Sequence, residues 1–128
     1  MAVRIVRLGS PRAADEGLRI GTVRRPPRGV PRSEFGKRDF YDVWFPNLAP
    51  SEALLKRAHA ATDERGWKSF VRAYRAEMKQ TQAGRELDLL AALSQMNNFS
   101  VGCYCADESR CHRSVLRELL REHGALIA

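Results

Sequence analysis

The hydrophobic positions of the chain follow two spacings, and each spacing predicts a different kind of element. Residues 2–8 alternate apolar and basic side chains with a period of two, which predicts a strand with one exposed face or an edge position. Residues 18–24 predict a second strand, and the aromatic segment 40–45 predicts a third strand or a packed extended segment. Residues 99–105 form a short apolar run rich in Val, Tyr and Phe, which predicts a buried strand.

Between the third and fourth of these segments the apolar spacing becomes helical. Ser51 is a good N-cap for a helix over residues 52–61, and residues 85–96 predict another helix. The clearest amphipathic pattern runs over residues 67–78, where Trp, Phe, Val, Tyr and Met side chains recur at helical spacing, and we expect this stripe to face the core. A last helix follows residue 110 and ends near Gly124. The positions expected to face the core are Leu87, Leu90, Ala91, Leu93, Val115, Leu116, Leu119 and Leu120.

Strands near both ends of the chain, with helices between them, predict the fold class. We expect a single compact α/β domain over residues 1–128, with a mainly parallel sheet flanked by helices in a three-layer, Rossmann-like arrangement. In such sheets ligands bind at the carboxyl ends of the strands. If the second and last strands are parallel neighbours, the loop over residues 24–38 and the loop after Cys105 lie at the same edge of the sheet.

The positive charge of the chain is concentrated in its first third. The net charge is +7, and residues 1–38 hold ten Lys and Arg against three acids, whereas the rest of the chain is balanced. Residues 24–38 contain three prolines and two glycines, so they predict an irregular loop, and six of their side chains are basic. This bias favours an anionic partner such as a nucleotide, a phosphorylated metabolite or a nucleic acid. The alternative is a solvated, arginine-rich surface.

Targeting signals and cysteine usage bear on the compartment. No run is long enough for a membrane span, and the first sixteen residues lack the apolar stretch of a signal peptide. Three cysteines, all within residues 103–111, do not make the disulfide framework of a secreted protein. We therefore expect a cytoplasmic protein with reduced thiols and no membrane partner.

Cys105 begins the loop that carries most of the candidate chemistry. A cysteine that ends a strand and precedes a helix has the topology of phosphatase- and rhodanese-like thiol enzymes, in which the helix dipole and loop amides lower the thiol pKa and hold an anion. Arg110 gives the C-x4-R spacing of rhodanese-like loops. Asp107 and Glu108 depart from that pattern, because their carboxylates repel an anion.

The same stretch also permits metal or redox chemistry. Cys103, Cys105, Cys111 and His112 supply four candidate ligands, but Cys111 and His112 are adjacent and would diverge on a helix, so we expect no bound metal and no cofactor. Cys105 and Cys111 flank the loop and would form a reversible disulfide if their Cα atoms lie within about 7 Å. Cys103 is interpreted as a small buried hydrophobe. His59 and His123 are interpreted as ordinary surface residues.

Over residues 18–124 the chain resembles the prokaryotic family known as domain of unknown function 488, including its YeaO-like branch. The residues that carry the resemblance are Arg24, Pro27-Arg28-Gly29, Asp42-Val43-Trp44, Leu48-Ala49-Pro50-Ser51, Trp67, Phe70, Tyr74-Arg75-Ala76-Glu77, Cys105-Ala106-Asp107 and Cys111-His112-Arg113. The YeaO-like pattern has an acid and a tryptophan where this chain has Val23 and Pro26. The resemblance implies an α/β domain with two functional cysteines, and it implies no particular reaction.

These observations lead to one preferred function and two alternatives. We expect a pocket at the carboxyl edge of the sheet that binds a small anionic, phosphate-containing ligand and offers a thiol nucleophile. The candidate catalytic residues are Cys105 or Cys111 as the thiol, His112 as acid or base, and Asp107 or Glu108 as its orienter. The candidate ligand-binding residues are Arg24, Arg28, Arg110 and Arg113 for charge and Tyr41 and Trp44 for stacking. The alternatives are a non-enzymatic nucleic-acid-binding module that uses the basic first third, and an interaction domain without chemistry.

Overall fold

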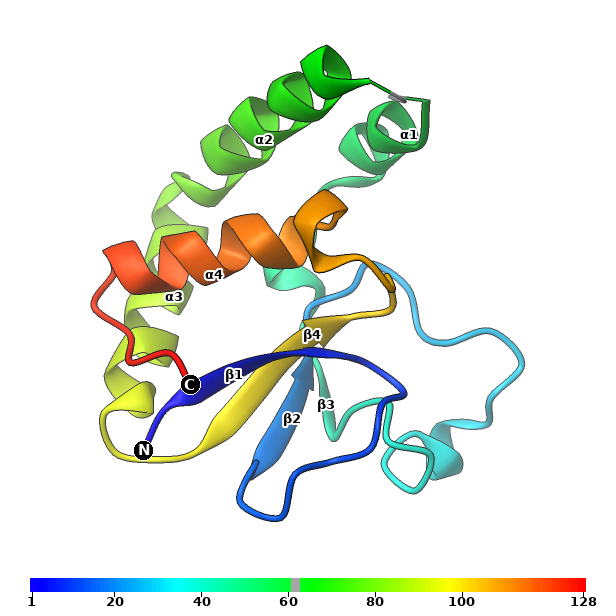
Figure 1. Ribbon diagram of the computed structural model, residues 1–128, viewed down its shortest axis with the longest axis vertical. Coiled ribbons are helices and arrows are strands. Elements are labelled where there is room, and N and C mark those ends of the chain that lie inside the picture. The colour runs from blue at the N-terminus through cyan, green and yellow to red at the C-terminus, as the bar shows by residue number, and fades with distance from the viewer. Residues whose placement is uncertain (61–62) are drawn as a thin grey trace.

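A parallel sheet of four strands lies at the centre of the protein (Figure 1). The computed structural model describes residues 1–60 and 63–128. The strands are β1 (Val3–Arg7), β2 (Leu18–Gly21), β3 (Val43–Trp44) and β4 (Phe99–Cys103), in the spatial order β1-β4-β2-β3. Every β4 residue is buried, as the apolar run predicts, because β4 has a neighbour on each side. The edge position expected for the first strand is confirmed.

All four strands are shorter than their patterns predict, β1 by one residue at each end. β2 ends at Gly21, where a side chain would collide with Tyr41: a Cβ placed there would lie 2.4 Å from the Tyr41 ring. β3 has only two residues, because its pairing with β2 is limited to Ile20 and Gly21. β4 ends at Cys103, so Cys105 lies in the following loop and not on the strand.

Four helices flank the sheet: α1 (Glu52–Ala60), α2 (Glu64–Met78), α3 (Thr81–Ser94) and α4 (His112–Glu122). The last residue of the predicted helix 52–61 lies outside the described residues. α3 begins four residues before its predicted start, and its early residue Ala83 is already packed in the core. Leu93 was expected to face inward, but it points to solvent with 37% of its surface exposed. Gly124 follows α4 with a φ of +94°, as predicted for a left-handed helix end.

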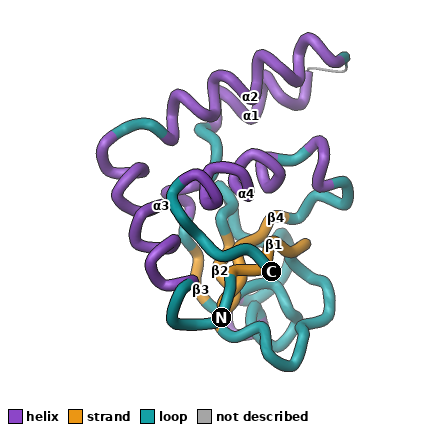
Figure 2. Tube along the Cα trace, turned by 60° about the vertical axis from the view of Figure 1, so that its left-hand side comes forward, coloured by secondary structure: helices purple, strands orange, loops and turns teal. Residues whose placement is uncertain are grey.

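The layers bring distant segments together. Figure 2 shows α1 and α2 side by side, with α4 between this pair and the sheet. The main core joins the inner face of the sheet to α2, α3 and α4 through Val3, Phe99, Val101, Tyr74, Leu87, Leu116 and Leu120. The architecture is the three-layer α/β arrangement with a parallel sheet that the sequence predicts. None of the helices within the described ranges combines the length and the apolar character needed to cross a membrane.

A second, smaller core lies at the carboxyl end of the sheet. Leu8, Val23, Tyr41, Cys103 and Cys111 pack together there, with partly buried aromatic side chains around them. This cluster connects the loop after β2, the loop after β4 and the start of α4. It therefore forms the support on which the two predicted functional loops rest.

Candidate functional site

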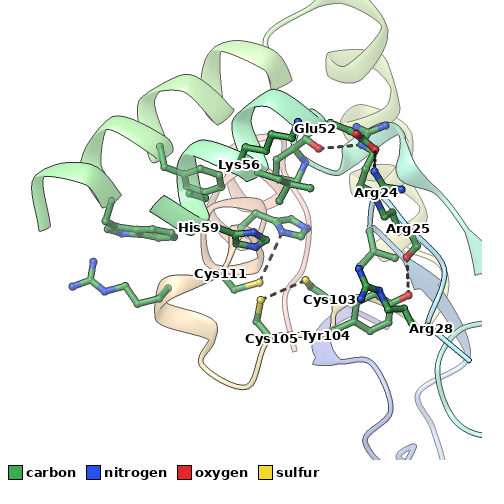
Figure 3. Close-up of a pocket in the computed structure, with 18 of the residues that line it drawn as sticks. Arg24, Arg25, Arg28, Glu52, Lys56, His59, Cys103, Tyr104, Cys105 and Cys111 are labelled. Carbon is green, nitrogen blue, oxygen red and sulfur yellow. Dashed lines mark hydrogen bonds and ion pairs between the residues drawn. The ribbon is translucent and has the colours of Figure 1, made fainter. Parts of the chain in front are cut away.

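A cavity of about 690 Å³ opens at the carboxyl edge of the sheet (Figure 3). Its walls come from the loop after β2, the α1–α2 pair, and the segment between β4 and α4. Arg28 from the basic loop and Cys105 from the cysteine loop both line it. β2 and β4 are parallel neighbours, so the two loops leave the sheet at the same edge, as the sequence predicts.

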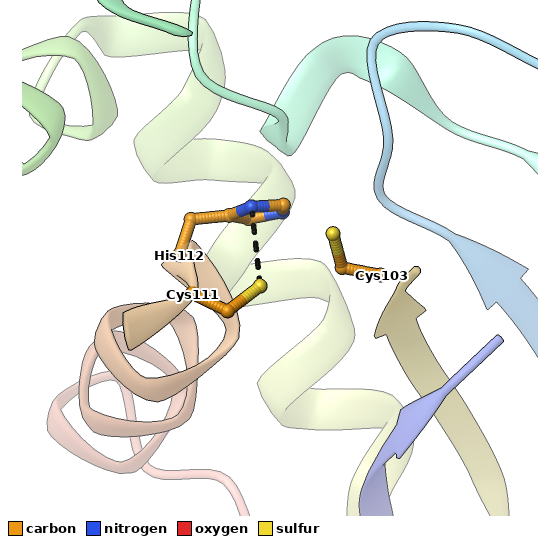
Figure 4. Close-up of side chains that lie close together, drawn as sticks. All are labelled: Cys103, Cys111 and His112. Carbon is orange, nitrogen blue, oxygen red and sulfur yellow. Dashed lines mark hydrogen bonds between the residues drawn. The ribbon is translucent and has the colours of Figure 1, made fainter. Parts of the chain in front are cut away.

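Three thiols and one imidazole gather at one wall of this cavity. The Sγ atoms of Cys103 and Cys105 are 3.8 Å apart, and Cys111 Sγ lies 3.8 Å from His112 Nδ1. The potential ligand atoms of Cys103, Cys111 and His112 all lie within 4.8 Å of one another (Figure 4). Cys103 and Cys111 are buried, whereas Cys105 is exposed. The cluster thus has a buried part and one thiol that faces the cavity.

Cys111 and His112 meet because only one of them is helical. Cys111 is the N-cap of α4 and has extended backbone angles, φ −122° and ψ 150°. Adjacent side chains diverge when both residues are helical, which is why the sequence pattern argued against their acting together. The extended N-cap redirects the Cys111 side chain, and the two groups point toward each other (Figure 4).

The protonation of His112 follows from its hydrogen bonds. Its Nε2 lies 2.8 Å from the carbonyl oxygen of Thr22, an acceptor only, so Nε2 carries the proton and donates it. Nδ1 is therefore left with a lone pair directed at Cys111. Burial lowers the pKa of His112 to about 4, so the ring is neutral near pH 7. A buried neutral ring with both nitrogens engaged is poorly placed to exchange protons with a ligand in the cavity.

The three thiols have different acidities because they share hydrogen bonds. The hydrogen bonds donated by Cys103 and Cys111, together with the charge of Arg113, hold the pKa of Cys105 well below its usual value. The pKa of Cys103 is raised because its thiol donates to Cys105 and is buried. The pKa of Cys111 is raised as well: a hydrogen bond from Cys103 lowers it, but hydrogen bonding to Cys105 and burial outweigh that effect. Cys105 is thus the thiol that ionises first.

Arg113 anchors the cysteine loop from below. Its side chain is only 4% exposed, and its Nη2 donates a 2.6 Å hydrogen bond to the carbonyl oxygen of Cys105. Its Nε has no hydrogen-bond partner among the described residues. Arg113 therefore acts on the backbone of Cys105 and does not line the cavity, whereas Arg25, Arg28, Lys56 and Arg110 do.

The two acidic residues of the loop are engaged elsewhere. Asp107 accepts hydrogen bonds from the backbone N–H and the hydroxyl of Ser109, at 3.0 and 2.7 Å, and so caps a short 3-10 turn. Glu108 accepts two hydrogen bonds from Arg117, at 2.7 and 2.8 Å. His112 has its own partners, Thr22 and Cys111, so neither carboxylate orients it as the sequence analysis expected.

The basic side chains around the cavity fall into two groups. Arg24 donates to the carbonyl oxygens of Ala49 and Pro50, and so it ties the loop to the start of α1. Arg25 pairs with Glu52, and Arg110 pairs with Glu64 while its guanidinium lies over the Trp67 ring. Arg28 and Lys56 also line the cavity, and among the described residues neither has an ion-pair partner. These two cations are the ones free to meet an anion.

The aromatic walls differ from the expected ones. Tyr41 is 3% exposed and packs in the small core beneath Gly21, and Trp44 lies at the sheet edge with its Nε1 donating to the Val23 carbonyl. Neither lines the cavity. The wall is formed instead by Trp67 and Phe70, whose rings stack with centroids 5.3 Å apart.

Sequence reasoning missed several lining residues for an identifiable reason. Trp67 and Phe70 belong to the amphipathic stripe that the sequence assigns to the core, and the stripe does reach the core at Phe70, Tyr74 and Met78. Lys56 and His59 come from the exposed face of α1 and carry no motif. Only the packing of α1 beside α2 turns these positions toward the cavity.

Comparison with known proteins gives one match. A family model described as the active DUF488-N3 subclade matches residues 3–124, which is nearly the whole chain. Searches of curated proteins and of solved structures found no match. The parallel α/β sheet and the cysteine–histidine cluster agree with the resemblance noted from Cys105, Cys111 and His112. The chain belongs to the DUF488 family, in its N3 subclade.

Proposed function

We propose that the cavity is the active site of a thiol enzyme that binds a small anionic, phosphate-containing ligand. The observation that carries this proposal is the position of Cys105: its exposed thiol lines the same cavity as Arg28 and Lys56, two cations without an ion-pair partner in the described part of the chain. A nucleophile and free positive charge in one concave site are what a reaction on an anionic substrate requires.

The shape and charge of the cavity favour a ligand with a ring and a phosphate. A volume of about 690 Å³ lies in the range of small-molecule sites. The stacked rings of Trp67 and Phe70 offer an apolar wall for a flat group, and Arg28 and Lys56 supply charge for the phosphate. The amino end of α4 adds the positive end of a helix dipole beside the cysteines. A mononucleotide combines these features.

The reacting group in this proposal is the Cys105 thiolate. It forms a bond from Sγ to an electrophilic atom of the ligand, and the displaced group leaves with the bonding electron pair. Cys111 and His112 are positioning residues that do not touch the ligand: Cys111 hydrogen-bonds to Cys105 and helps to keep it ionised, and His112 contacts Cys111. Arg113 fixes the backbone of Cys105.

The test is alkylation of each cysteine by iodoacetamide across pH, located by mass spectrometry, with and without AMP or inorganic phosphate. We expect Cys105 to react at a pH well below the free-thiol pKa of about 8.5, and AMP to protect it. Arg28→Ala should abolish the protection. Arg32→Ala is the matched control, because Arg32 belongs to the same loop but does not line the cavity. Equal, ordinary reactivity of all three thiols, indifferent to AMP, would contradict the proposal.

The second candidate function is nucleic-acid binding by the basic loop. The side chains of Arg25, Arg28, Arg32 and Arg38 are all exposed on it, which leaves them accessible to a phosphate backbone. If this function holds, the protein shifts DNA or RNA in a salt-dependent way, and replacing these four arginines abolishes the shift. Protection of Cys105 by AMP without such a shift favours the enzyme.

A further inference from the structure

The buried half of the cysteine cluster, Cys103, Cys111 and His112, does not touch the ligand in the proposed reaction, and its donor atoms are arranged like a metal site. We propose that Cys103, Cys111 and His112 bind one Zn²⁺ ion whose fourth coordination position opens to the cavity. This inference does not depend on Cys105 being a nucleophile.

The spacing of the donors is close to that of a zinc site. With Zn–S bonds of about 2.3 Å and Zn–N bonds of about 2.0–2.1 Å in tetrahedral geometry, neighbouring donors stand about 3.5–3.8 Å apart. Cys111 Sγ and His112 Nδ1 are 3.8 Å apart, and all three donors lie within 4.8 Å of one another. The third donor, Cys103 Sγ at the carboxyl end of β4, lies within 4.8 Å of the other two.

The imidazole already has the form that a metal ligand needs. A ligating histidine offers one nitrogen lone pair to the metal and donates its other N–H to a fixed acceptor, which sets the tautomer and the ring orientation. In this protein Nε2–H donates to the Thr22 carbonyl oxygen at 2.8 Å, and Nδ1 is directed at the sulfurs. The Thr22 carbonyl oxygen, in the loop after β2, thus already holds the His112 ring in the orientation that metal binding requires.

The type and burial of the donors select zinc. Two thiols and an imidazole are soft and borderline donors, unlike the carboxylate and carbonyl oxygens that Mg²⁺ and Ca²⁺ require. All three residues are at most 7% exposed, so the ion would be shielded from water except on the cavity side. When Zn²⁺ binds, the two thiols release their protons to solvent, and the two thiolates neutralise the charge of the ion. No buried charge is left uncompensated.

Three protein ligands and one open position distinguish this arrangement from a closed structural zinc site. The open position faces the cavity, since Cys103, Cys111 and His112 all line it. Cys105 stands on this side, with its Sγ 3.8 Å from that of Cys103, and it is exposed. An oxygen of a ligand in the cavity would therefore reach the ion without passing through the core.

The experiment measures metal content and affinity in the full-length protein. Protein produced in zinc-supplemented medium and purified without a histidine tag is analysed by mass spectrometry for all transition metals, and the metal-free protein is titrated with Co²⁺. We expect one zinc per chain and a thiolate-to-cobalt charge-transfer band that Zn²⁺ abolishes by displacement. Cys111→Ser and His112→Gln should each weaken Zn²⁺ binding by about a hundredfold or more. Cys105→Ser is the control and should keep one tightly bound zinc.

Several results would overturn the inference: wild-type protein without stoichiometric metal, preference for another metal, or unchanged affinity in Cys111→Ser. Loss of zinc in Cys105→Ser would overturn the three-ligand arrangement. If the Cys111→Ser and His112→Gln variants fail to fold, zinc binding is tested in the wild-type protein by alkylation. After partial denaturation, added Zn²⁺ should block alkylation of Cys103 and Cys111. Cys105→Ser also separates the two proposals, because it removes the reactive thiol but not the zinc site.

Discussion

Two buried polar clusters stand on the same pair of strands, and they differ in whether their hydrogen bonds are complete. Arg19 of β2 and Ser100 of β4 are paired across the sheet, and both are fully buried with Glu16. Glu16 accepts two hydrogen bonds from Arg19, at 2.7 and 2.9 Å, and one from Ser100 at 2.7 Å. Arg19 Nη1 donates to the carbonyl oxygens of residues 10 and 39, so each guanidinium nitrogen has at least one partner.

At the other end of β4 the cysteine–histidine cluster is incomplete. Its side-chain contacts are long: Cys103 Sγ lies 3.8 Å from Cys105 Sγ and Cys111 Sγ lies 3.8 Å from His112 Nδ1, and the cluster borders a cavity. A buried ion pair with every donor and acceptor satisfied stabilises one arrangement of the chain, because it has no capacity left for a ligand. A cluster of thiols and an imidazole whose lone pairs are unused, and which borders a cavity, can still bind a ligand. The degree of hydrogen-bond satisfaction thus separates a structural polar cluster from a functional one.

The largest effect should come from breaking the complete cluster. Arg19→Met leaves the Glu16 carboxylate buried without its partner, and we expect a loss of about 3–5 kcal/mol in the free energy of unfolding, measured by urea denaturation. Arg4→Met is the matched control, because Arg4 forms an exposed ion pair with Asp15; it should cost less than about 1 kcal/mol. Equal losses in the two variants would show that the buried Arg19–Glu16 pair contributes no more to the free energy of unfolding than an exposed ion pair.

The next effect concerns Arg28, a cavity-lining cation for which residues 1–60 and 63–128 provide no ion-pair partner. Arg28→Ala should weaken AMP binding by about tenfold or more, since a charge-assisted hydrogen bond to phosphate contributes about 1.5–3 kcal/mol. Isothermal titration calorimetry measures this directly. Arg32→Ala, on the same loop but outside the cavity, should leave the affinity unchanged. If both variants weaken binding alike, the loop attracts anions through its overall charge and not through the cavity.

A smaller effect is expected when one sulfur is removed from the cysteine–histidine cluster by mutation. In metal-free protein, Cys103→Ala removes one buried sulfur without leaving a charge or an unsatisfied donor, so we expect a loss of only about 1 kcal/mol in thermal or urea unfolding. That value should stand well below the loss caused by Arg19→Met. A comparable loss would mean that the thiols are as essential to folding as the ion pair.

The smallest effect should appear in the pH dependence of stability. Burial raises the pKa of Glu16, but the hydrogen bonds from Arg19 and Ser100 outweigh burial and hold the pKa below the ordinary value of 4.5. The carboxylate therefore contributes stability that is present above pH 4.5 and is lost as the pH falls through the lower, folded-state pKa. Glu16→Gln should flatten this acid loss relative to wild type in urea titrations at a series of pH values. An unchanged slope would assign the loss to other carboxylates.

Much of the fold could be predicted because its information is local. The period-two segment became β1, the apolar run became β4, and the helical stripe of residues 67–78 became α2, since each pattern records which face of an element is buried. The convergence of the basic loop and the cysteine loop followed from one further assumption, that the second and last strands are parallel neighbours.

The candidate site was less predictable because side chains meet there across elements. Residue type alone favours Tyr41 and Trp44 as stacking walls, but the short β3 and the glycine at position 21 place Tyr41 in a core. Trp67 was assigned to the core, although the start of α2 projects beyond the sheet and leaves this ring beside the cavity. No periodicity distinguishes these outcomes.

From the sequence alone came the α/β class, the order of the elements, and the residues that carry the chemistry at the start of α4. Tertiary structure decided how those residues combine. The extended backbone of Cys111 turns it toward His112, and the strand end at Cys103 brings a sulfur from β4 to the same place. These side-chain contacts depend on one N-cap conformation and on strand register. Both arise only when distant segments pack, so the hydrophobic spacing along the chain does not encode them.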